Sequence, residues 1–182
     1  MAFQSGKFAL VVQGGLEVSM AFTKTKVETY VGGDLYSESS DSDDESFLAM
    51  GMGFQGEVGL SDATALFFGL DFGYPFDDDW EDWYGGVVVN FGARFALAGG
   101  NVLGLGMGYK FTGDPEYPVF AADLELGSAK LGEVMTPYFG VAWRRHSDEW
   151  RAGGTSNYTI TSVTTNDYTF AFGLRARVEL SK

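Results

Sequence analysis

The chain contains a single histidine, His146, which is followed directly by Ser147 and Asp148. Serine, histidine and a carboxylate are the side chains of hydrolases in which the histidine activates the serine as a nucleophile. On a β-strand, however, consecutive side chains point to opposite faces, so His146 and Ser147 would not meet there. The sequence also has no Gly-x-Ser-x-Gly motif. We therefore expect a structural histidine and no catalytic residue, with a lipid-modifying enzyme as an alternative.

Carboxylates gather in two polar segments of the chain. Their oxygen atoms are ligands that Ca²⁺ and Mg²⁺ accept, but the spacing does not fit an EF-hand loop, because no Asp-x-Asp-x-Asp-Gly run with a later Glu occurs. Charge runs of this kind are usually solvated surface, so we expect no metal and no cofactor. The two clusters are Glu38, Asp41, Asp43, Asp44 and Glu45, and then Asp77, Asp78, Asp79, Glu81 and Asp82.

The composition narrows the classes of function. The 182 residues are enough for one domain, and the absence of cysteine excludes disulfides and cysteine nucleophiles. The formal net charge of −13, from 12 basic and 25 acidic residues, argues against nucleic acid as a partner, because such partners need a surface that neutralises phosphates. No apolar run reaches the roughly 18 to 20 residues of a transmembrane helix. Residues 1–7 lack the basic and apolar regions of a signal peptide, so the chain either stays inside the cell or has lost its signal.

Three segments alternate strictly between two kinds of side chain. In 170–180, large apolar residues occupy nearly every second position, and Ala, Gly, Arg and Glu fill the positions between them. Segments 102–111 and 48–60 follow the same rule, with glycine frequent in the second set. An alternation of period two predicts β-strands. Strands of this kind favour the second explanation of the N-terminus, in which a signal peptide has been removed.

The same pattern, with more exceptions, extends to eight segments in a single domain over 1–182. Short turns alternate with longer polar links, an order that predicts an all-β, eight-stranded antiparallel up-and-down barrel. Strands are expected near 8–22, 47–60, 65–74, 86–97, 102–111, 118–126, 137–145 and 168–180. Long loops are expected at 23–46, 75–85, 112–117 and 146–167.

The two faces of these strands are inverted relative to a soluble protein. Large aliphatic and aromatic side chains form one face of every strand, whereas the other face is mostly Gly and Ala with charges of both signs. This distribution predicts a transmembrane barrel that is apolar outside and polar or small inside. The expected lumen charge network has six acids and five bases, which can pair with one another: Glu17, Glu57, Asp71, Arg94, Lys110, Asp123, Glu125, Arg144, Arg175, Arg177 and Glu179.

The membrane itself sets the size and closure of such a barrel. A membrane strand needs about 9 to 11 residues, and unpaired strand edges are too costly in hydrocarbon, so the barrel must close. With eight strands the lumen is just wide enough for side chains to fill it, so we expect no wide pore. A narrow porin-like channel is an alternative. A soluble sandwich or a lipocalin-like barrel is another, and each predicts solubility without detergent.

The pattern resembles the small eight-stranded outer-membrane β-barrels of Gram-negative bacteria, such as the outer membrane protein A barrel, outer membrane protein X and opacity-type proteins. Residues 136–143, Thr-Pro-Tyr-Phe-Gly-Val-Ala-Trp, are similar to the Pro-Tyr-x-Gly-x-Gly strands of such barrels. Gly173, Val178 and Leu180 are similar to the C-terminal assembly signal that the outer-membrane insertion machinery reads. The chain departs from that signal by ending in Leu-Ser-Lys, where a terminal Phe or Trp is usual.

The resemblance implies a monomer in the cell outer membrane, in contact with membrane lipid and lipopolysaccharide. It implies a surface or structural role without enzyme activity, through loop presentation, adhesion or envelope integrity. Five basic residues are expected near the outer rim, where they either bind lipopolysaccharide phosphates or offset the acidic loops. These are Lys24, Lys26, Arg144, Arg145 and Arg151.

Overall fold

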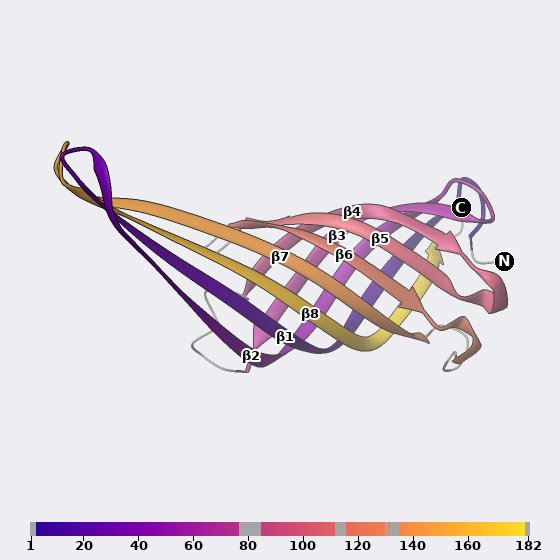
Figure 1. The fold of residues 1–182 in the computed structure, drawn as a ribbon. Coiled ribbons are helices and arrows are strands. Elements are labelled where there is room, and N and C mark those ends of the chain that lie inside the picture. The colour runs from indigo at the N-terminus through magenta and orange to yellow at the C-terminus, as the bar shows by residue number, and fades with distance from the viewer. Residues whose placement is uncertain (1–2, 77–84, 112–115, 130, 132–134, 181–182) are drawn as a thin grey trace.

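Eight antiparallel strands form a closed barrel in the computed structural model (Figure 1). The structure describes residues 3–76, 85–111, 116–129, 131 and 135–180. Each strand pairs with its neighbours in sequence, and the first pairs with the last. The strands are β1 (Phe8–Val31), β2 (Asp34–Gly59), β3 (Thr64–Pro75), β4 (Gly86–Ala96), β5 (Val102–Lys110), β6 (Tyr117–Glu125), β7 (Met135–Gly153) and β8 (Tyr158–Leu180). Short 3₁₀ turns follow β4 at Ala98–Gly100 and β6 at Gly127–Ala129.

The alternating sequence places its two sets of side chains on opposite sides of the barrel wall. Phe68 and Phe172, on the outer surface, are 61% and 58% exposed, whereas Arg94, inside the lumen, is 0% exposed. In water this outer surface would be a very large apolar patch, but in a bilayer it is a lipid-facing belt. The predicted inversion, apolar outside and polar or small inside, is confirmed. Among the residues that the structure describes, no helix is long and apolar enough to span a membrane.

The barrel closes along the pairing of β1 with β8, which runs from Phe8 opposite Leu180 to Tyr30 opposite Tyr158. Gly15 and Gly173 lie opposite each other in this seam. A Cβ atom at either position would overlap with the backbone of the facing strand, so glycine is needed for this close approach. The closed ring pairs both edges of each strand in the belt, as hydrocarbon requires.

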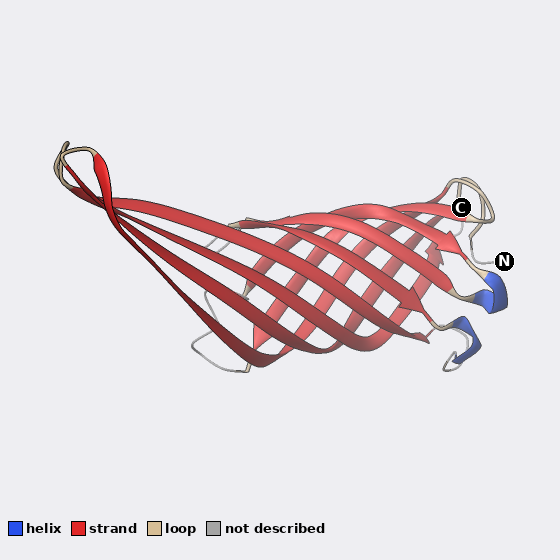
Figure 2. Cartoon of the chain, viewed as in Figure 1, coloured by secondary structure: helices blue, strands red, loops and turns tan. Residues whose placement is uncertain are grey.

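The two ends of the barrel differ in the length of their connections (Figure 2). Both termini and the short connections β2–β3, β4–β5 and β6–β7 lie at one end, which we call the turn end. From the other end, the arm end, a narrow twisted extension of β1, β2, β7 and β8 projects (Figure 1). We call this extension the arm and define it as residues 23–46 and 145–167. In transmembrane barrels of the outer membrane, short turns face the periplasm and longer segments lie at the opposite end, which is the end from which the arm projects here.

The arm corrects two expected loops. We expected polar loops over 23–46 and 146–167, but these segments continue the strands and pair with one another. Thr25 on β1, for example, lies opposite Asp41 on β2 and Val163 on β8. Frequent β-branched residues along β1 and β8 favour extended backbone here, although the composition is polar. Of the other two expected loops, 77–84 and 112–115 lie outside the described residues.

Candidate functional site in the barrel lumen

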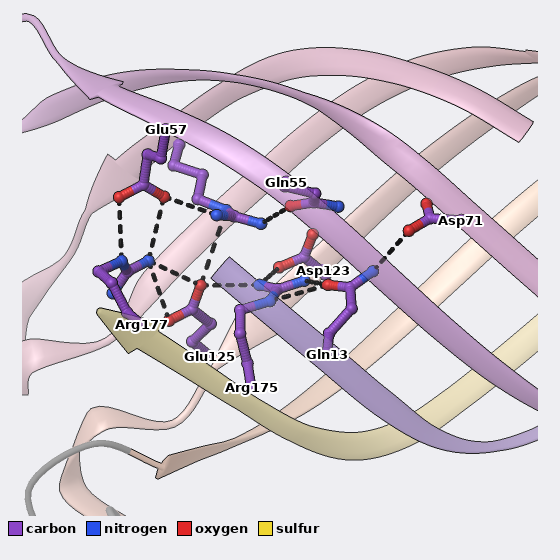
Figure 3. Close-up of polar contacts among 9 residues, drawn as sticks. Gln13, Gln55, Glu57, Asp71, Asp123, Glu125, Arg175 and Arg177 are labelled. Atoms are coloured by element: carbon purple, nitrogen blue, oxygen red, sulfur yellow. Dashed lines mark hydrogen bonds and ion pairs between the residues drawn. The ribbon is translucent and has the colours of Figure 1, made fainter. Parts of the chain in front are cut away.

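Lumen-facing side chains near the turn end form one ion-paired layer, most of which Figure 3 labels. Because each member occupies an inward position of the alternating pattern, the closed ring brings together charges that lie far apart in sequence. Three carboxylates face three guanidinium groups, so the layer has no net charge. We call this set the charge layer: Glu57 on β2, Arg94 on β4, Asp123 and Glu125 on β6, and Arg175 and Arg177 on β8.

Glu57 binds two arginines of this layer. Its Oε2 atom lies 2.6 Å from Nη1 of Arg94, and its Oε1 atom lies 2.9 Å from Nε of Arg177. Arg94 is completely buried, so its charge depends on this pairing rather than on water. The Arg94 guanidinium also lies over the ring of Phe67, with its carbon 4.8 Å from the ring centroid. Glu57 therefore links β2 to β4 and β8.

Arg175 holds the other half of the charge layer. Its Nη1 atom lies 2.5 Å from Oδ1 of Asp123 and 2.7 Å from Oε1 of Glu125. Its Nε and Nη2 atoms donate to Oε1 of Gln13, at 2.9 and 2.6 Å. Glu125 accepts from Nη2 of Arg177 at 3.1 Å, which joins the two halves (Figure 3). Each nitrogen of the Arg175 guanidinium thus has an acceptor, which makes the burial of this arginine tolerable.

Neutral amides complete the charge layer, and the sequence analysis, which considered only charged residues, missed them. Gln55, 4% exposed, accepts from Nη2 of Arg94 at 2.5 Å. Gln13 also donates through Nε2 to Oδ1 of Asp71 at 3.1 Å. The signal was present, because both glutamines stand at inward positions among small residues of an alternating segment.

The N-terminal residues close the lumen on the turn side of the charge layer. Phe3 is 4% exposed and packs against Ala65 and Val102. The Arg177 guanidinium carbon lies 5.5 Å from the centroid of the Phe3 ring. No periodic pattern includes Phe3, so sequence reasoning had no signal for it. Phe3 and the charge layer together fill the turn end of the lumen.

A second buried ion pair lies near the arm end. Nη1 of Arg144 is 3.1 Å from Oδ2 of Asp167, and Arg144 also donates to the hydroxyl of Thr169. We had assigned Asp167 to a loop, but β8 extends far enough to place it opposite Arg144. Lys110, also completely buried, has its ammonium nitrogen 5.2 Å from the ring centroid of Tyr117.

A cavity of about 130 Å³ lies between the charge layer and the pair near the arm end. Glu17, Asp71 and Asn90 are among the residues that line it. Glycines of β2 make the room, because a Cβ atom at Gly51 would collide with the Glu17 carboxylate and one at Gly53 with that of Asp71. The glycine-rich inner face is therefore what allows acids and a cavity to share a narrow lumen.

Ten of the eleven predicted lumen charges are buried or half-buried and Glu179 is exposed, and the eleven do not form one network. Six make the charge layer, and Arg144 pairs with Asp167. Within the described residues, Asp71 accepts from the amides of Gln13 and Asn90 only, and Glu17 has neither hydrogen bond nor ion pair. Two residues remain. Lys110 is completely buried, and Glu179 is exposed at the turn end.

The structure separates the residues of the possible hydrolase. His146 Nε2 lies 2.6 Å from Oδ2 of Asp148, within the arm. The Ser147 hydroxyl instead lies 3.0 Å from that of Thr164, on the opposite face of the sheet. His146 therefore does not contact Ser147, as the alternation of side chains on a strand requires.

The other expected features lie at the surface. The first acidic cluster, from Glu38 to Glu45, lies along β2 in the arm, and the second, at 77–82, lies outside the described residues. In the described part of the chain, no three His, Asp or Glu side chains are placed to hold a metal ion. Of the residues similar to an assembly signal, Val178 and Leu180 are half exposed on the lipid-facing belt, and Gly173 lies in the β1–β8 seam.

Comparison with known proteins supports the fold. No family model matches the sequence, and no curated protein is significantly similar to it. The structure is similar to that of the outer membrane protein OprG from Pseudomonas aeruginosa, with a TM-score of 0.54 and 12% identity over 97% of both chains. The outer membrane protease OmpT from Escherichia coli gives a TM-score of 0.49 and 8% identity, over 92% of this chain and 97% of that one. The second similarity is too low to support an argument, whereas the first shows a shared fold.

The chain therefore has the fold of an eight-stranded outer-membrane β-barrel, as the sequence predicted. Its lipid-facing belt suits the bilayer, and its lumen holds the buried charge layer and a cavity that lies between this layer and the arm. Such a lumen supports the wall from inside and leaves the arm as the large water-facing surface.

Proposed function

We propose that this protein is a surface protein of the outer membrane, in which a closed barrel anchors the arm and the arm tip binds an extracellular partner. The barrel supplies the anchor, because its belt is apolar and its lumen is filled at the turn end. The arm supplies the binding surface, because it extends the strands beyond the belt.

The observation that carries this proposal is the apolar character of the arm tip. Leu35, Tyr36 and Trp150 are 51%, 77% and 51% exposed, although they lie well beyond the lipid-facing belt. Large apolar side chains gain nothing from water, and clusters of them on a water-facing surface are typical of binding sites. Aromatic residues are also the side chains that contribute most to protein interfaces.

Contacts between the two hairpins also support the tip, which favours binding. The rings of Tyr30 and Tyr158 stack with their centroids 4.6 Å apart, and the Arg151 guanidinium carbon lies 3.5 Å from the Tyr158 centroid. The backbone N–H of Gly33 donates to the carbonyl of Ser156 at 3.0 Å and joins the tips of the two hairpins. A preformed surface loses little conformational entropy when a partner binds.

Adhesion of cells that produce the protein tests the proposal. A shortened arm can be made by joining Thr23 to Asp43 and Arg145 to Asn166 through Asn-Gly turns, because these residues already lie opposite each other. We expect the shortened protein to insert normally but to lose adhesion to epithelial monolayers. The double variant Tyr36→Ser with Trp150→Ser should lose most of it.

Ser147→Ala, in the arm but away from the tip, is the matched control and should adhere like the wild type. Insertion is checked by the different gel mobilities of heated and unheated samples. Adhesion by the shortened protein at the wild-type level would contradict the proposal.

The sealed turn end also supports a role other than conduction. A narrow channel is the second candidate, and the lumen cavity favours it, but the charge layer and Phe3 fill the lumen below that cavity. We expect purified protein in planar bilayers to give no steady unitary current. Regular wild-type current steps would favour the channel over the closed barrel.

A further inference from the structure

Two basic residues of the arm are engaged by the arm itself. Lys26 makes ion pairs with Glu28 and Glu38, with N···O distances of 2.6 and 3.4 Å. The Arg151 guanidinium lies over the Tyr158 ring and donates to two backbone carbonyl oxygens of the β7–β8 turn. Lys26 therefore offsets acids of the arm and Arg151 supports its tip, so both have partners within the protein.

The other basic residues expected near the rim are arranged differently. Arg144 lies in the lumen and pairs with Asp167, which leaves Lys24 and Arg145. Both of these side chains are exposed, and within the described residues neither makes an ion pair or a side-chain hydrogen bond. The formal net charge of the chain is −13, so acids are abundant. Two cations that remain without an acid in such a chain indicate an anion that comes from outside the protein.

Strand register places Lys24 and Arg145 near each other on the outer face. Lys24 on β1 lies opposite Thr164 on β8, and Arg145 on β7 lies opposite Asn166, two residues further along β8. With neighbouring strands about 4.8 Å apart and a rise of about 3.3 Å per residue, the two Cα atoms are about 12 Å apart. Both side chains are long, so their charged ends can reach one anion.

An aromatic band lies on the same outer face, directly on the barrel side of the two cations. Tyr168 follows Asn166 by two residues on β8 and lies opposite Trp143 on β7. Phe22 on β1 lies opposite Asn166 and meets the Tyr168 ring edge to face, with centroids 6.0 Å apart. Bands of aromatic residues occupy the interface regions of membrane barrels. The two cations therefore lie at the level of the lipid head groups.

From this placement we infer that Lys24 and Arg145 form a binding site for the phosphate group of a membrane lipid, in the leaflet at the arm end. Lysine and arginine donate charge-assisted hydrogen bonds to phosphate oxygens. Neutral donors accompany the two cations on this face: the amide of Asn166 and the hydroxyls of Thr164 and Ser147, which lie 3.0 Å apart. A lipid is favoured over a soluble anion because the aromatic band and the apolar belt beside the site can hold its acyl chains.

Such a lipid would connect the two hairpins of the arm at their base. Lys24 belongs to the β1–β2 hairpin, and Arg145 belongs to the β7–β8 hairpin. A phosphate held by both would also attach the base of the arm to the membrane surface. This site is separate from the arm tip, so the inference goes beyond the proposed adhesion and does not rest on it.

Dioleoylphosphatidic acid, whose head group is a bare phosphate, is the probe for this site. Purified protein in detergent is titrated with this lipid, and native mass spectrometry counts the lipids bound per barrel. We expect saturable binding to the wild type. The affinity should fall about fivefold in Lys24→Gln and in Arg145→Gln, and about thirtyfold in the double variant, as expected for basic residues next to anionic head groups.

Lys7→Gln is the matched control, because it removes one exposed lysine at the turn end. It should bind the lipid like the wild type. Two further ligands separate the phosphate from the acyl chains. Dioleoylglycerol has the same chains without the phosphate and should not bind saturably. Glycerol 3-phosphate has the head group without the chains and should not displace the lipid at equal concentration.

The heated and unheated gel bands show that each variant is folded before binding is compared. No saturable binding by the folded wild type would overturn the inference, and so would an unchanged affinity in the folded double variant. An equal loss in Lys7→Gln, or equal binding of dioleoylglycerol, would overturn it as well. Displacement by glycerol 3-phosphate at equal concentration would show a site for free phosphate and would overturn the membrane lipid as its source. The adhesion of the arm does not depend on these outcomes.

Discussion

The charge layer and the arm contain ion pairs of the same length in very different surroundings. Arg94 and Glu57 lie 2.6 Å apart with side chains 0% and 3% exposed. Lys26 and Glu28 in the arm also lie 2.6 Å apart, but their side chains are 39% and 20% exposed. Breaking a buried pair leaves a charge without water, whereas an exposed charge simply regains its hydration. Burial, not distance, therefore decides which pairs hold this protein together.

Removing Arg175 is the strongest test of this contrast. Arg175→Met leaves Asp123 and Glu125 buried with fewer partners, and we expect the free energy of unfolding to fall by about 3–5 kcal/mol. Urea titration in detergent, with the heated and unheated gel bands as readout, measures the loss. Arg145→Met removes an exposed arginine of the arm and should have a much smaller effect. Similar losses for the two variants would refute the role of burial.

A methyl group added where β1 and β8 approach closely should destabilise the barrel more than one added at a roomier position of β1. Gly15→Ala places its Cβ atom against the backbone of β8, and we expect a loss of about 1–3 kcal/mol, as in other overpacked sites. Gly14→Ala is the matched control, because its Cβ atom would lie 3.6 Å from the nearest atom, an ordinary contact. The two urea midpoints can be compared directly, and coincident midpoints would contradict the close approach of β1 and β8.

The smallest effect is expected for the exposed pair in the arm. The hydrogen bond from Lys26 lowers the pKa of Glu28, and the same bond raises the pKa of Lys26. The Glu28 contribution to stability is thus lost as the pH falls through its lowered pKa, and that of Lys26 is lost as the pH rises through its raised one. At pH values between the pKa of Glu28 and that of Lys26, both side chains contribute to stability.

In Lys26→Met we expect the Glu28 pKa to return toward its usual value, measured by NMR titration of the carboxyl carbon, while the urea midpoint hardly moves. Lys24→Met, which removes a lysine without an ion pair among the described residues, should leave the Glu28 titration unchanged. A Glu28 pKa that stayed low in Lys26→Met would show that another group causes the shift.

The faces of the strands were predictable because the lipid imposes a strict period of two. Phe172 and Arg175 could be assigned to opposite sides of the wall from their positions alone, since a one-residue shift would reverse every side chain. The arm was not predictable in this way. Outside the bilayer both faces of a strand meet water, so residues such as Ser40 and Ser42 need not alternate with apolar ones, and a paired strand has the composition of a loop.

The lumen was predictable in composition but not in its pairings. Which acid meets which base depends on register and on strands across the ring, as for Glu57 of β2 with Arg177 of β8. The uncharged members, such as Gln13, were missed because a count of charges ignores amides. Asn90, which donates to Asp71, was missed for the same reason.

The seam between β1 and β8 has a consequence for the order of folding. Phe8 pairs with Leu180, so the first strand finds its second partner only when almost the whole chain has been made. Pairings between such distant residues form slowly, because the entropy of closing so long a loop must be lost first. Until then the backbone N–H and C=O groups along one edge of β1 are unpaired and can bind other chains. A chain interrupted before Tyr158 has no β8 to pair with them. Such a fragment should aggregate rather than insert, and the pairing of β1 with β8 should be a late step in folding.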